Sequence, residues 1–163
     1  MKTEPDKELQ KRLGFAKLLV CGKDIDLKAA AHNYPRKTIA TGQNEGLLAK
    51  SLKDRNTVGV LPSSMPSKKL IALIAESSKI LFVNVNTIIN VDPKQQQKLI
   101  YLYRKTMHYC KQFKVNVCPI TLAASGTEML SARQLMLLIK FLGFKGDEKK
   151  ALSALGGLHG KDN

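Results

Sequence analysis

Short apolar runs alternate with longer amphipathic stretches along the chain. The apolar runs are rich in Val, Ile and Leu and predict five buried strands, at residues 14–20, 37–41, 57–61, 80–85 and 115–122. The stretches between them predict helices over residues 26–31, 47–52, 67–74, 93–113 and 131–142, and a last short helix over 147–155. Strands that are apolar throughout are typical of parallel sheets covered by helices. We therefore expect an α/β fold with a mainly parallel sheet.

Polar residues mark where several of these helices begin. Ser67 and Ser131 stand at N-cap positions, and Asp92-Pro93 combines an N-cap with proline at the first helical position. Gly42-Gln43-Asn44-Glu45-Gly46 lacks the lysine and hydroxyl of a phosphate-binding loop. We interpret it as a turn into a helix.

A length of 163 residues favours one domain, which we place at residues 13–163. Residues 1–12 are charged and predict a mobile or loosely helical N-terminal segment. A complete eight-stranded barrel usually needs about 250 residues. The predicted sheet is therefore open, incomplete, or contains strands that the pattern does not reveal.

The formal net charge is +14, from 27 Lys and Arg against 13 Asp and Glu. Such an excess favours a polyanionic partner, either nucleic acid or an anionic membrane surface. No apolar run reaches the ~18 residues of a membrane span. The three cysteines form no C-x-x-C pair, and Cys21 and Cys118 occupy apolar, strand-like positions. Reduced, buried thiols and a cytoplasmic location are expected.

The sequence shows no catalytic constellation. His32, His108 and His159 are far apart and lie in no H-x-H or H-x-x-x-H pattern. The carboxylates are equally scattered, and Glu128 is the only one near Arg133. We therefore predict no metal site, no cofactor and no catalytic residue.

Positive charge is the remaining signal. The long helix carries Arg104 and Lys105 among other cations, interleaved with Tyr101, Tyr103 and Tyr109. Such a row is either a solvated helix face or a surface that binds phosphates. Arg133 stands in the first turn of an apolar helix, where the helix dipole disfavours a cation. It is either a surface arginine paired with Glu128 or a phosphate ligand together with the helix N-terminus.

The segment around Arg133 resembles ribonuclease P protein component 3, the barrel-type subunit of archaeal and eukaryotic ribonuclease P. The resemblance covers residues 57–155. It rests on Ala123-Ala124, Glu128, Leu130 to Leu135, Leu142-Gly143-Phe144 and Glu148 to Leu155, and upstream on Val58 to Pro62, Ile80 to Val85 and Phe113-Lys114-Val115. Of the family's Arg-x-Pro-Arg-Asp-Leu-like helix start, the second arginine is present as Arg133. Leu130, Ala132 and Gln134 replace the first arginine, the proline and the acidic residue.

The resemblance implies a shortened or incomplete TIM-like barrel from an archaeal lineage. It implies an RNA-binding subunit that supports the catalytic RNA of ribonuclease P in removing the 5′ leader from precursor tRNA. The implied partners are that RNA, precursor tRNA and the ferredoxin-like component 2. Arg133 would contact RNA by its matched position, and Lys149 and Lys150 are further candidates from charge alone.

Two other functions remain open at this stage. One is a different basic RNA-binding structural protein of the ribosomal type, which would share the charge. The other is a barrel-fold metal-dependent phosphoesterase, which would need His and Asp clusters at strand ends.

Overall fold

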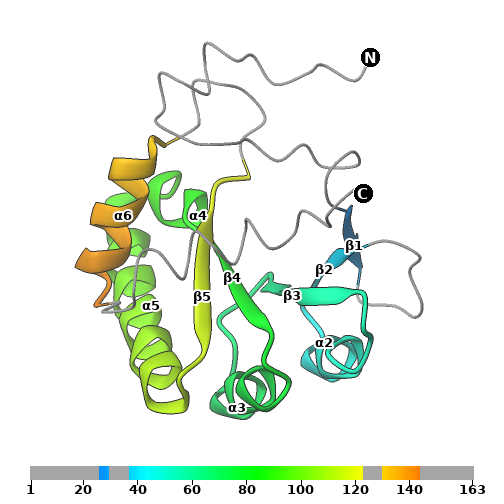
Figure 1. Ribbon diagram of the computed structural model, residues 1–163. Coiled ribbons are helices and arrows are strands. Elements are labelled where there is room, and N and C mark those ends of the chain that lie inside the picture. The colour runs from blue at the N-terminus through cyan, green and yellow to red at the C-terminus, as the bar shows by residue number, and fades with distance from the viewer. Residues whose placement is uncertain (1–25, 30–36, 123–129, 144–163) are drawn as a thin grey trace, which may run out of the picture.

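The computed structural model describes residues 26–29, 37–122 and 130–143. Within these ranges strands and helices alternate (Figure 1). The elements are β1 (Asp26–Ala29), β2 (Thr38–Gly42), α2 (Glu45–Ser51), β3 (Thr57–Pro62), α3 (Lys68–Glu76), β4 (Ile80–Asn84), α4 (Asn86–Ile89), α5 (Pro93–Phe113), β5 (Asn116–Ile120) and α6 (Ala132–Phe141).

The five strands form one parallel sheet in the order β1-β2-β3-β4-β5. Each strand therefore lies beside its predecessor in the chain, and every crossover steps in the same direction. Because such crossovers are right-handed, they place the connecting helices on one face of the sheet. In the described part of the chain β1 and β5 do not pair with each other, so the described sheet is open.

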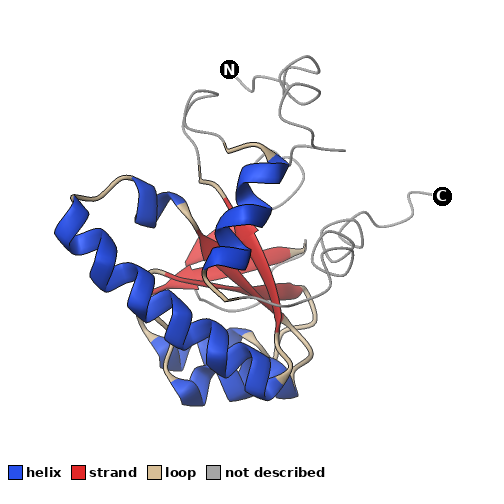
Figure 2. Ribbon diagram, turned by 90° about the vertical axis from the view of Figure 1, so that its left-hand side faces the viewer, coloured by secondary structure: helices blue, strands red, loops and turns tan. Residues whose placement is uncertain are grey.

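The larger core lies between the sheet and this layer of helices (Figure 2). Val60, Leu81 and Val117 of the strands meet buried side chains of α2, α3, α5 and α6. A smaller cluster of Ile39, Leu61, Phe82 and Cys118 lies on the opposite face. A parallel sheet whose described connecting helices lie on one face is the arrangement of part of an α/β barrel.

The pairing of β3 with β2 has one irregularity. The register with β2 passes from Thr38 opposite Thr57 to Ile39 opposite Gly59, so Val58 is an extra residue. As a result Val58 faces the smaller cluster and Val60 the larger one. Gly59 is required beside this bulge, because a Cβ there would lie 2.2 Å from the backbone oxygen of Ile80.

The structure confirms most of the predicted elements and corrects one. The strands at 37–41, 57–61, 80–85 and 115–122 and the helices at 47–52, 67–74, 93–113 and 131–142 are present. The helix expected over residues 26–31 is wrong, because residues 26–29 form β1 and pair with β2. The predicted strand at 14–20, the segment 1–12 and the helix at 147–155 lie outside the described residues.

Candidate nucleic-acid interface

The long helix α5 is delimited by clear signals at both ends. The Asp92 side chain accepts hydrogen bonds from the backbone N–H groups of Lys94 and Gln95, at 3.0 and 3.2 Å. Pro93 follows as the first helical residue. At the other end Lys114 adopts a left-handed conformation with φ 58°, and Val115 N–H donates to the Cys110 carbonyl at 2.8 Å. The helix has 21 residues and is therefore about 32 Å long.

The two sides of α5 differ in chemistry. Tyr103, Thr106, Met107 and Cys110 are buried against the rest of the molecule. The outer side contains no carboxylate, because residues 93–113 include neither Asp nor Glu. Its exposed cations are Lys94, Lys98, Arg104, Lys105 and Lys111. Tyr101 stands among them with 67% of its surface exposed.

The second helix of this surface, α6, carries Arg133 in its first turn. Ser131 and Gln134 form a reciprocal capping box: Gln134 N–H donates to Ser131 Oγ at 3.3 Å, and Ser131 N–H donates to Gln134 Oε1 at 2.8 Å. The cap therefore uses the N–H of Gln134, while Arg133 lies exposed at the helix start. Glu128, its expected partner, lies outside the described residues.

Arg104 joins α5 to α6. Its guanidinium lies 4.7 Å from the centroid of the Phe141 ring and donates to the Phe141 carbonyl at 3.3 Å. The sequence predicted Arg104 as an RNA-binding residue, and the structure shows it exposed while it also holds the end of α6. Lys105, the neighbouring candidate, is exposed on α5.

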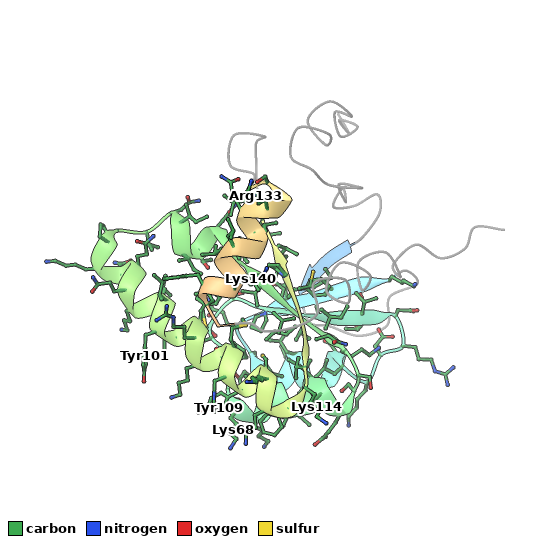
Figure 3. All side chains as sticks on the ribbon, turned by 60° about the vertical axis from the view of Figure 1, so that its left-hand side comes forward. Lys68, Tyr101, Tyr109, Lys114, Arg133 and Lys140 are labelled. Atoms are coloured by element: carbon green, nitrogen blue, oxygen red, sulfur yellow. The ribbon has the colours of Figure 1, made fainter. Side chains whose placement is uncertain are left out.

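On the other flank of α5, Lys68 extends the charge to α3. Its ammonium lies 5.8 Å from the ring centroids of both Tyr109 and Phe113. Sequence reasoning did not find Lys68, because no local pattern connects residues so far apart in the chain. Figure 3 shows Lys68 beside Tyr109, with Arg133 and Lys140 towards the two ends of α6. We call this surface the basic face: Lys68, Lys94, Lys98, Tyr101, Arg104, Lys105, Lys111, Lys114, Arg133 and Lys140.

The remaining predicted site residues, Lys149 and Lys150, lie outside the described residues. Asn44 caps α2, accepting from the N–H groups of Gly46 and Leu47, which confirms that the glycine-flanked loop is a turn into a helix. The neighbouring Glu45 carboxylate accepts from both the N–H and the hydroxyl of Ser67, each at 2.6 Å.

The two described cysteines and Tyr103 are buried. Burial raises the pKa of the Cys110 and Cys118 thiols to about 12, which makes them poor nucleophiles. Burial also raises the pKa of Tyr103, and its hydrogen bond with Thr87 acts in the opposite direction. Among the described residues, no three His, Cys, Asp or Glu side chains converge as metal ligands.

No helix in the described ranges combines the length and the apolar character needed to cross a membrane. A scan against models of known protein families and a search of curated proteins find no match to this chain.

Proposed function

We propose that this protein binds RNA through the basic face. The observation that carries this proposal is that α5 and α6 present cations and an exposed tyrosine with no carboxylate in either helix. Lysine and arginine side chains that neutralise phosphates release condensed counterions, which drives binding without any sequence readout. Tyr101 adds a flat aromatic surface on which an unpaired base can stack.

We further propose that the RNA is that of ribonuclease P, which the protein supports during removal of the 5′ leader from precursor tRNA. This step is supported by the resemblance of residues 57–155 to component 3 and by the exposed position of Arg133. The parallel, sequentially ordered sheet suits an incomplete TIM-like barrel. The proposal includes the ferredoxin-like component 2 as the protein partner.

The first test measures how RNA affinity depends on salt. Lys98→Gln/Lys105→Gln removes two exposed cations from the basic face, and Lys50→Gln/Lys53→Gln removes two exposed cations near the end of α2. We expect the slope of log affinity against log salt to fall by about 1.4 for single-stranded RNA in the first variant only. Equal slopes in both variants and the wild type would place the RNA elsewhere.

The second test concerns Arg133 in a reconstituted ribonuclease P holoenzyme. Arg133→Ala leaves the capping box intact and should lower precursor-tRNA cleavage about tenfold, the cost of losing one charged hydrogen bond. Arg55→Ala, an exposed arginine in the turn before β3, is the matched control and should retain full activity. Undiminished cleavage by Arg133→Ala would refute its assignment.

Sequencing the RNA that co-purifies with the tagged chain from its native cells shows whether the bound RNA is that of ribonuclease P or of the ribosome. Enrichment of ribonuclease P RNA together with a component 2 homologue supports the full proposal. Enrichment of ribosomal RNA would retain the basic face as an RNA-binding surface and reject the ribonuclease P assignment.

A further inference from the structure

A pocket of about 490 Å³ opens where β2, β3 and β4 end. Thr41, Pro62 and Asn84, at the carboxyl ends of these three strands, all line it. The loop at residues 63–66 and the inner side of α5 complete its walls. The carboxyl edge of a parallel sheet is where ligands bind in α/β folds, and this volume lies within the range of small-molecule sites.

The walls of this pocket are largely apolar and uncharged. Leu81 and Val83, exposed by 1% and 6% on the helix-covered face of the sheet, form a buried apolar wall, and Leu102 contributes from α5. None of the lining residues in the described part of the chain is Asp, Glu, Lys or Arg. A charged group entering the pocket would lose its hydration without gaining a counter-charge. The pocket therefore suits a neutral ligand.

Polar groups line the strand ends. Asn84 Oδ1 accepts from the N–H groups of Asn86 and Leu122 at 3.2 and 3.4 Å, which leaves the Asn84 NH₂ as the end available to a ligand. Thr41, Ser63 and Ser64 also line the pocket, and the described structure gives their hydroxyls no hydrogen bond. A ligand with apolar faces and a polar edge would match both kinds of wall.

The wall beside Asn84 is preorganised. Tyr103 OH donates to the Asn84 carbonyl at 3.0 Å, Thr87 Oγ1 lies 2.7 Å from the same carbonyl, and the two hydroxyls are 2.6 Å apart. These contacts fix the end of β4 against α4 and α5. On the opposite side Thr106 Oγ1 contacts Met65 Sδ at 3.7 Å, and the loop after β3 is also held by the N–H of Ser63, which donates to the Gly42 carbonyl at 3.0 Å.

The pocket adjoins the basic face along α5. Leu102 follows Lys98 by four residues and precedes Lys105 by three, so all three share one strip of the helix surface. Both lysines are exposed. We propose that the pocket binds one unstacked nucleobase, while Lys98 and Lys105 hold the phosphates beside it. The identification of RNA as the source of that base rests on the proposed function.

Filling the pocket tests this proposal. Leu102→Trp places a larger side chain in it, and Leu47→Trp makes the same change on α2, away from the basic face, where Leu47 is 43% exposed. Ser64→Phe, at the exposed loop, is a second pocket-filling variant should Leu102→Trp fail to fold. The probes are a single-stranded oligoadenylate, the same strand paired with oligouridylate, and the four free nucleosides observed through the methyl resonances of Leu102 and Met65.

We expect the wild type to bind the single strand more tightly than the duplex. Pocket filling should weaken single-strand binding about tenfold, which is the affinity that one bound base contributes. Duplex binding and its salt dependence should be unchanged, and Leu47→Trp should bind like the wild type. Nucleoside-induced shifts without a single-strand preference would support the site and identify a free nucleoside as its ligand. Absence of both effects would overturn the pocket proposal, whereas failure to bind either RNA would instead reject the proposed function.

Discussion

At the scale of single residues, Lys114 stands in a conformation that its side chain disfavours. It ends α5 with φ 58° and ψ 36°, the left-handed region where glycine is usual. Holding a residue with a Cβ there costs about 1 kcal/mol. The same residue is exposed on the basic face. A cation kept at a backbone site that favours glycine is consistent with a role for its charge.

Replacing this lysine separates stability from binding. Lys114→Gly should raise the free energy of unfolding by about 1 kcal/mol, because glycine adopts the left-handed conformation without a Cβ clash. It should also lower the salt slope of RNA binding by about 0.7, since one cation is lost. Urea unfolding and RNA titration measure the two effects.

Lys111→Gly is the matched control, three residues upstream in the helical last turn. It removes the same charge but should lower stability by about 1 kcal/mol, because glycine is a poor residue inside a helix. Opposite changes in stability with equal changes in salt slope are expected. A loss of stability in both variants would contradict the strain argument at Lys114.

At the scale of elements, the bulge in β3 decides which side chains reach each face of the sheet. Without the extra residue Val58, the residues before it would fall on the opposite faces, because side chains alternate along a strand. Gly59 permits the close approach to β4, where a Cβ would also lie 2.7 Å from the Phe82 ring. The glycine therefore sets how closely β3 approaches β4.

Gly59→Ala should lower the free energy of unfolding by about 3 kcal/mol, because the new methyl group meets the backbone of β4 rather than a movable side chain. Gly46→Ala serves for comparison. A Cβ at that position approaches only the Asn44 side chain, at 3.2 Å, so the change should remain within about 1 kcal/mol. Similar thermal stability of the two variants would show that β3 and β4 can separate at low cost.

Sequence patterns predicted the elements whose local signals agree with their place in the sheet. The capped helices α3, α5 and α6 and the apolar strands β3, β4 and β5 are of this kind. The alanines at residues 29–31 predicted a helix over 26–31. Alanine favours a helix by only a few tenths of a kcal/mol per residue, and the pairing of residues 26–29 with β2 outweighs that preference. The four-residue α4 was missed because it is too short for a helical period.

The candidate site was predictable only in part, because some of its contacts join residues that are distant in the sequence. The cations of α5 and Arg133 can be read from their helices, whereas contacts such as Lys68 with Tyr109 exist only after folding. The capping box of α6 could have been found, since Ser131 and Gln134 have the required spacing. The pocket could not, because its walls come from three strand ends, a loop and a helix.

At the scale of the whole molecule, the surface cations and the buried cysteine thiols occupy different regions. The chain carries a net charge of +14, and the cations named above are at the surface of α5 and α6. The buried thiols belong to the two core clusters, Cys110 on the helix-covered face of the sheet and Cys118 on the other. Their ionisation therefore reports on the packing of both faces, independently of the basic face.

This arrangement predicts a specific alkaline instability. Burial raises the pKa of both thiols from 9.0 to about 12, so the folded protein favours their neutral form. Their contribution to stability is fully present below about pH 9 and is lost as the pH rises towards 12, because the unfolded chain releases those protons first. Buried Tyr103, whose pKa is also raised, acts in the same direction.

Cys110→Ala/Cys118→Ala should therefore show a shallower fall in unfolding free energy between pH 8 and 11 than the wild type, measured by urea unfolding at each pH under reducing conditions. The single variants divide the effect between the two faces of the sheet, and a double variant with the wild-type slope would mean that water reaches both thiols in the folded protein.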